Sequence, residues 1–176
     1  MNTTPKSNPL LTRFRKSKSG ATAIEFAIVA LPFITLMFAI FDVSLVYFST
    51  SVLESSVASA SREIRTGQVQ SSGMTESQFR QLVCDRISAL MACDSRLMID
   101  VRRFNNFGSI ATPPALNANG SFAGNQQFNA GGSGDVIVVR AFYAWPMLTP
   151  SGLVYSNMTG HARLLSATTA FRNEPF

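Results

Sequence analysis

The stretch SGATAIEFAIVALPFITLMFAIF, residues 19–41, decides the fold of this chain of 176 residues. Residues 26–41 carry no charge. The mostly apolar segment extends over residues 21–48, which as a helix is about 42 Å long at about 1.5 Å per residue. The hydrocarbon core of a bilayer is about 30 Å thick, so this helix is long enough to span it. The core helix of a soluble protein seldom stays this apolar for so long. The segment therefore predicts a membrane-spanning helix.

The basic charge of the chain is concentrated before this stretch. The net charge is +5 and the isoelectric point is about 9.8, which would suit a nucleic-acid-binding protein. However, the ten basic residues after Gly20 are balanced by ten acids, so no nucleic-acid binding is expected. The positive-inside rule places the N-terminus in the cytoplasm and the C-terminal part across the membrane. Five basic residues precede Gly20, and they also suit contact with acidic membrane lipid: Lys6, Arg13, Arg15, Lys16 and Lys18.

A single carboxylate, Glu25, lies where the basic leader meets the apolar segment. A Glu at the edge of a membrane span costs free energy unless something uses it. The junction resembles the cleavage site of type IV prepilins, in which a membrane peptidase cuts after a Gly and a Glu is the fifth residue of the new chain. A cut between Gly20 and Ala21 makes Glu25 the fifth residue. The resemblance implies that residues 1–20 are a leader peptide that a prepilin peptidase removes.

Two other interpretations of the same segment stay open. A permanent, uncut signal anchor has the same basic flank and span, but it does not need the spacing of Gly20 and Glu25. An ordinary secretory signal would be cut after the small residues Ala58-Ser59-Ala60. The apolar region of such signals is about 7–15 residues long, which is shorter than the segment here.

Glu25 and a row of alanines are the candidate contact residues of the span. Cleavage would create a free α-amine on Ala21, and Glu25 is expected to pair with the α-amine of an incoming subunit and so set the axial register. The alternative is a solvated Glu25 among the lipid headgroups, with no such role. Small side chains allow close contact between membrane helices, and Ala23, Ala27 and Ala30 form a small-residue stripe.

The helical pattern continues beyond the membrane. Gly67 is a plausible end, so one helix is expected over residues 21–66, about 69 Å at the same rise per residue. Half of it would leave the bilayer and lie against other structure, as the spine of a filament subunit does. The alternative is a simple stalk. The apolar face beyond the membrane has the spacing of a helix and consists of Leu53, Val57, Ala60 and Ile64.

Residues 67–176 are expected to form one exported domain. Thr75 and Gln78 fit a capping box, which predicts the start of a second helix. Alternating or β-branched apolar residues predict strands over residues 97–104, 136–143 and 162–172. A small antiparallel sheet packed on a long N-terminal helix gives the fold class α+β, with a pilin-like arrangement.

The segment between the first two predicted strands has an unusual composition. Residues 105–134 contain no charge, six Asn and six Gly. So long a loop is uncommon in a compact domain and is usually functional or disordered. A mobile insertion and a subunit-contact surface both stay open, and the dispersed Phe107, Phe122 and Phe128 favour the second.

The chain contains two cysteines, Cys84 and Cys93. No residues at usable spacing supply two further ligands, so a metal site is not expected. A disulfide is permitted outside the cytoplasm. Nine residues apart on one helix, the two would lie on opposite faces. A bond therefore requires the helix to end near Ala92 and the chain to turn back, and two buried thiols are the alternative.

No enzyme signature and no cofactor motif is found. His161 is the only histidine, which excludes His-based metal clusters, and nothing near it suggests a Ser-His-acid arrangement. The glycine-rich run at residues 131–135 lacks the Lys-Ser/Thr of a phosphate loop and precedes a strand rather than a helix. The protein is expected not to be an enzyme.

The junction over residues 20–26, the Phe/Ile/Leu-rich anchor and the tail AFRNEPF at residues 170–176 together resemble the TadE-like family. Its members are minor pseudopilins of the bacterial tight-adherence (Tad, or Flp) type IV pilus, which serves adhesion among other uses. The major Flp pilins are much shorter, so about 110 residues beyond the long helix favour a minor subunit.

The resemblance implies a bacterial inner-membrane protein with a cytoplasmic N-terminus and a periplasmic domain, processed between Gly20 and Ala21. The implied partners are the prepilin peptidase, other pilins and pseudopilins, and the inner-membrane platform of pilus assembly. The alternatives are a minor pseudopilin of a type II secretion system and a signal-anchored periplasmic interaction protein.

Overall fold

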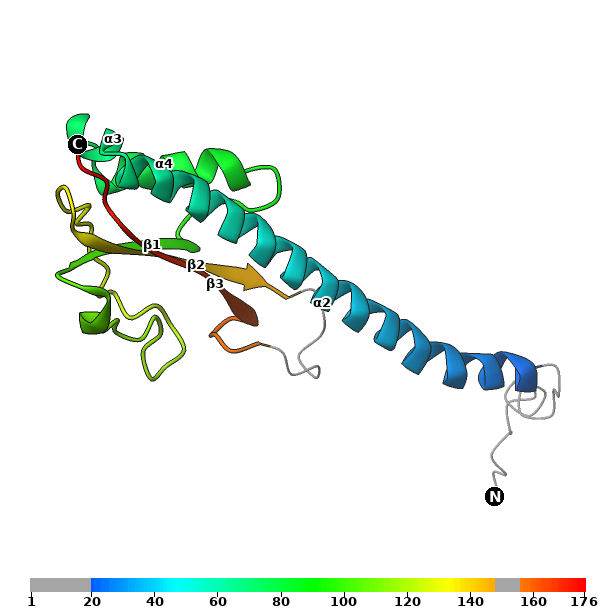
Figure 1. Cartoon of the computed structure of the whole chain (residues 1–176). Helices are drawn as coiled ribbons and strands as arrows, with labels where there is room; N and C mark the ends of the chain where they lie inside the picture. Colours follow the sequence, from blue (N-terminus) through cyan, green and yellow to red (C-terminus); the bar gives the residue numbers. More distant parts are fainter. Residues whose placement is uncertain (1–19, 148–155) are drawn as a thin grey trace, which may run out of the picture. The chain divides into compact units, whose positions relative to one another are not determined.

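The computed structural model describes residues 20–147 and 156–176, and the predicted leader lies outside these ranges except for Gly20. The chain divides into two compact units, Met1–Ile40 and Phe41–Phe176. Helix α2, Ala21–Arg65, has residues in both units (Figure 1). Each unit is described by itself.

In the first unit, the described residues are almost entirely helical and their apolar side chains are exposed. Phe26 is 74% and Leu31 70% exposed. Pro32 lies inside the helix, where it removes one backbone donor. Among the described residues, α2 is the one helix long and apolar enough to cross a membrane. It is the candidate single-pass membrane anchor.

The second unit contains an antiparallel sheet with the order β1-β2-β3. The strands are β1, Leu97–Phe104, β2, Val136–Pro146, and β3, Ala162–Arg172. The predicted α+β class is confirmed, and β2 extends three residues further than predicted. It ends at Pro146, which has no N–H to continue the ladder and is the last residue paired with β3.

The second half of α2 covers one face of this sheet (Figure 1). The predicted stripe of Leu53, Val57, Ala60 and Ile64 is at most 1% exposed, so the apolar face is confirmed. It packs in one core with alternate residues of the strands, since successive strand side chains point to opposite faces. The strand residues of this core include Ile99, Val101, Val139, Ala141, Leu165 and Ala167.

Two short helices follow α2. Gly67 has a φ of +80°, a left-handed conformation that favours glycine, and it separates α2 from α3, Gln68–Ser71. Helix α4, Glu76–Ile87, begins with the predicted capping box. The Thr75 hydroxyl accepts from the Gln78 N–H at 3.4 Å, and the Thr75 N–H donates to Gln78 Oε1 at 2.8 Å.

Candidate functional site

The structure gives no folding reason for a glycine at position 20. Gly20 is exposed and immediately precedes α2, which begins at Ala21. It is not among the glycines with a positive φ, and a Cβ added there would meet no atom within 4 Å. Among the described residues, nothing therefore stands in the way of a Cβ at this position.

The other predicted residues of the span lie along the first turns of α2. Glu25 is the fifth residue of the helix and is exposed. Ala23 and Ala27 are exposed as well, and Ala30 is partly buried. The part of the chain that the structure describes holds no salt bridge to Glu25. These side chains are therefore available to other molecules rather than used within the fold.

A buried carboxylate lies on the sheet face opposite α2 in the second unit. Asp100 is 1% exposed, and its Oδ2 accepts from Arg140 Nη2 at 2.6 Å and from Arg140 Nε at 3.0 Å. Arg102 Nε donates to both carboxylate oxygens at 2.9–3.0 Å. We call Asp100, Arg102 and Arg140 the buried ion cluster.

The buried ion cluster ties down the uncharged segment 105–134. The backbone N–H of Gln127 donates to Asp100 Oδ1 at 2.8 Å, and Arg140 Nη1 donates to the carbonyl of Pro113 at 2.8 Å. Arg102 also donates to the carbonyl of Asn125. Burial opposes ionisation of Asp100, but the hydrogen bonds from Arg102, Arg140 and the Gln127 N–H outweigh it and lower its pKa.

The alternation in the sequence places Asp100 and Arg102 on the strand side opposite Ile99 and Val101, and the structure buries Asp100 on that side. The segment 105–134 folds back over that side and supplies carbonyl groups to the arginines. One signal was present in the sequence. Arg140 is a lone charge within the apolar run 136–145, and a buried arginine needs an acidic partner.

The end of the same segment is held by the C-terminal tail. Asn173 is 3% exposed, and its Nδ2 donates to the carbonyls of Ala130 and Gly132 at 3.0 and 2.9 Å. Asp135 accepts from the Gly132 N–H at 2.8 Å and pairs with Arg103 at 2.7 Å. These two bonds lower the pKa of Asp135, with the backbone bond as the larger cause.

The last residues of the tail lie at the C-terminal end of α2. The Glu174 N–H donates to the Arg65 carbonyl at 2.9 Å, and the two side chains form a salt bridge of 3.1 Å. The Phe176 ring lies directly over Gly67, where a Cβ would overlap it. The tail therefore joins β3 to the long helix, as Figure 1 shows for the red segment.

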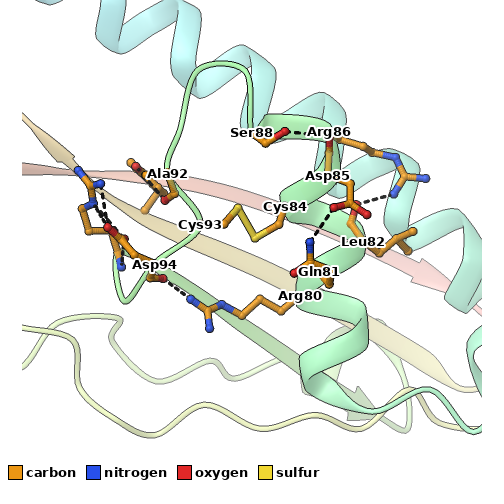
Figure 2. Close-up of a disulfide and its surroundings, with 12 residues drawn as sticks. Arg80, Gln81, Leu82, Cys84, Asp85, Arg86, Ser88, Ala92, Cys93 and Asp94 are labelled. Carbon is orange, nitrogen blue, oxygen red and sulfur yellow. Dashed lines mark hydrogen bonds and ion pairs between the residues drawn. A yellow bond between two sulfur atoms is a disulfide. The ribbon is translucent and has the colours of Figure 1, made fainter.

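Figure 2 shows the disulfide between Cys84 on α4 and Cys93, with a Cα–Cα distance of 5.7 Å. The helix ends at Ile87, five residues before the expected Ala92, and the chain turns through N–H bonds of Leu90 and Met91 to the Ile87 carbonyl. This reversal brings the two cysteines to the same side. The bond closes a small loop at the start of β1.

The described residues offer no arrangement typical of a metal site. Among them, no three His, Cys, Asp or Glu side chains lie together as metal ligands. His161 has a φ of +56° and belongs to the turn before β3.

The apolar N-terminal helix and the small antiparallel sheet define the chain as an α+β protein with a candidate single-pass anchor. The family model described as TadE-like protein matches residues 20–62, which begin at Gly20 and end within α2. The resemblance read from the junction is thereby confirmed for the N-terminal helix. The match suggests an involvement in the Tad pilus. No curated protein matches the chain, and no solved structure does.

Proposed function

We propose that the protein is a minor pseudopilin that supports assembly of a Tad/Flp pilus, after a prepilin peptidase removes residues 1–20. One observation carries this proposal. The family match begins at Gly20, the residue after which the peptidase would cut, and it continues along α2. The exposed Gly20 has no role in the fold, so a peptidase that requires close backbone approach accounts for it.

The alternative cut after Ala58-Ser59-Ala60 fits the structure poorly. Ala60 is fully buried inside α2, and a cut after it would remove Leu53 and Val57 from the core. The domain would lose three of the four residues of the apolar stripe that covers its sheet. Processing at residue 20 leaves this core whole.

In this proposal the apolar part of α2 lies in the bacterial inner membrane, with the N-terminus in the cytoplasm and the second unit in the periplasm. The partners are the prepilin peptidase, other pilins and pseudopilins, and the inner-membrane assembly platform. Glu25 pairs with the new α-amine of a neighbouring subunit and sets its axial register. Ala23, Ala27 and Ala30 allow a second helix to approach closely.

N-terminal sequencing of membrane-extracted protein tests the processing step. The wild-type chain is expected to begin at Ala21. Gly20→Phe should leave the full-length precursor, and Gly20→Ala is the matched small control. Because a Cβ at position 20 meets no described atom within 4 Å and the position lies outside the core, a block in processing is expected to report recognition by the peptidase and not misfolding. A wild-type chain that retains residues 1–20 would contradict the proposal and favour an uncut signal anchor.

A second pair of variants tests the role of Glu25. Glu25→Ala should be processed to Ala21 yet fail to assemble with partner pseudopilins. Glu54→Ala removes another exposed carboxylate of the same helix and should leave assembly unchanged. Normal piliation in Glu25→Ala, with stable processed protein, would refute the register role and leave the processing proposal intact.

A further inference from the structure

The two edge strands of the sheet differ in whether other described residues hydrogen-bond to their outer backbone groups. On the outer edge of β1, segment 105–134 forms a single bridge: the Val101 N–H donates to the Gln127 carbonyl at 2.8 Å, and the Asn129 N–H donates to the Val101 carbonyl at 2.9 Å. The outer edge of β3 has no such cover among the described residues. One edge is therefore protected and the other is open.

The open backbone groups of β3 can be assigned from the ladder. The Leu164 N–H donates to the Asn157 side chain, and the Ala162 carbonyl accepts from Asn157 and Met158, so the even-numbered residues face away from β2. Outward and inward groups alternate along an antiparallel strand. Ser166, Thr168 and Ala170 therefore present N–H and C=O groups outward, and these have no hydrogen-bond partner in the part of the chain that the structure describes.

Among the described residues, nothing along this edge blocks another strand. Proteins usually protect an edge with a lysine, a proline, a bulge or a covering loop. Residues 164–171 contain no charge and no proline, and the register with β2 is unbroken. The side chains of Ser166, Thr168 and Ala170 are small and exposed. An extended segment can approach the edge over this length.

A groove of about 400 Å³ runs between this edge and α2. It is lined on the α2 side by Ala58, Ser61, Arg62 and Arg65 and on the β3 side by Thr169, Ala170 and Phe171. Ser61 is 3% exposed, and its hydroxyl has no hydrogen-bond partner among the described residues, an arrangement that costs free energy unless a ligand supplies one.

The charge of the groove is basic. Arg65 is paired with Glu174, but no ion pair with a described residue engages the exposed Arg62. A strand added to β3 lies about 4.8 Å away and directs alternate side chains toward α2. An acidic side chain in that position would reach Arg62 and the Ser61 hydroxyl.

We propose that the open edge of β3 binds an extended, acidic segment of a different protein by strand addition, with its carboxylates on Arg62 and Ser61. A second copy of this chain suits the site poorly. Its own β3 contains no acid and has Arg163 and Arg172 near its ends, and the one acid of β1 is buried in the ion cluster. The site is independent of the membrane anchor and of leader processing.

Hydrogen exchange of the full-length protein in detergent tests the site. The probe is a short synthetic peptide that alternates valine with glutamate, and the matched control peptide has lysine in place of glutamate. With the glutamate peptide, the amides of Ser166, Thr168 and Ala170 should exchange at least about tenfold more slowly, because each gains a strand hydrogen bond. The lysine peptide should protect them less.

Two variants separate the backbone from the charge. Thr168→Pro removes an N–H that points outward and makes no hydrogen bond to β2. It should weaken binding of the glutamate peptide about tenfold. Thr168→Val keeps the N–H and is its control. Arg62→Gln should reduce the preference for glutamate over lysine by about threefold. Arg86→Gln, on the separate Arg86–Glu63 pair, should leave it unchanged.

Several results would overturn the proposal. If both peptides protect the amides equally, the partner need not be acidic and that part of the proposal is wrong. If neither peptide protects the amides of Ser166, Thr168 and Ala170 in the wild-type protein, β3 does not bind a partner by strand addition. Hydrogen exchange of the wild-type protein needs no variant, so it tests strand addition even if Thr168→Pro does not fold. Dimers of the wild-type chain that Thr168→Pro abolishes would show that the occupant is a second copy.

Discussion

Replacement of Asp100 by asparagine is the sharpest test of how the second unit is held together. Asparagine keeps the size of the side chain and still accepts a hydrogen bond from the Gln127 N–H. It removes the one acid among the described residues that pairs with Arg140 and Arg102, whose side chains are 8% and 15% exposed. Two guanidinium groups then remain side by side without an anion.

The expected loss of stability is large. Removing one partner from a buried ion pair costs about 3–5 kcal/mol, because the remaining charge stays buried. A small domain has a free energy of unfolding of about 5–15 kcal/mol, so Asp100→Asn should lose about a fifth of it or more. With a urea dependence of about 2 kcal/mol per molar, the unfolding midpoint should fall by about 2 M.

The single tryptophan of the chain provides the assay. Trp145 lies on β2, the strand that carries Arg140, and is 9% exposed. Its fluorescence in urea should report unfolding of the sheet in the full-length protein in detergent. Asp94→Asn is the matched control, since its pair with Arg96 is half exposed and should contribute little to the stability of the fold.

The comparison of these two variants can refute the reasoning. If Asp100→Asn lowers the midpoint no more than Asp94→Asn does, the buried ion cluster does not stabilise the sheet. The second unit would then depend on its apolar core alone.

The pH dependence supplies an independent check with a defined sign. The pKa of Asp100 is lower in the folded protein than in the unfolded chain, where it is about 3.9. Its contribution to stability is therefore complete above about pH 4 and is lost as the pH falls through the folded value. The difference between wild type and Asp100→Asn should shrink over that acidic range and stay constant at neutral pH.

Three further predictions concern the disulfide, the tail and the topology. Removal of the disulfide by Cys84→Ala with Cys93→Ala should cost about 2–3 kcal/mol, measured by the same urea titration, and thiol labelling of the unreduced, denatured wild type should find no free cysteine. Gly67→Ala should destabilise the folded protein by about 1–2 kcal/mol, because φ is positive at this position. Its Cβ also displaces the Phe176 ring, so carboxypeptidase should cleave the tail, and an intact tail would contradict this prediction. Alkaline phosphatase fused after Phe176 should be active, whereas an inactive fusion with an active cytoplasmic reporter would reverse the topology.

The sequence by itself determined the features that depend on local patterns. Uncharged length predicts the span of α2, helical spacing predicts the stripe from Leu53 to Ile64, and Thr75 and Gln78 predict the start of α4. The alternation of residues 97–104 predicts β1 with its observed bounds. Each of these signals is contained within a few turns or one strand, so it does not require knowledge of the rest of the chain.

The tertiary structure alone decided which polar groups are buried and which backbone groups stay open. Asp100 is bound by groups 27 and 40 residues away in the chain, and the tail meets Gly67 only after the sheet has formed. The same folding covers the edge of β1 and leaves that of β3 open, although both strands have clear patterns in the sequence. Side-chain periodicity specifies the two faces of a strand, but the neighbour of an edge is set by long-range packing.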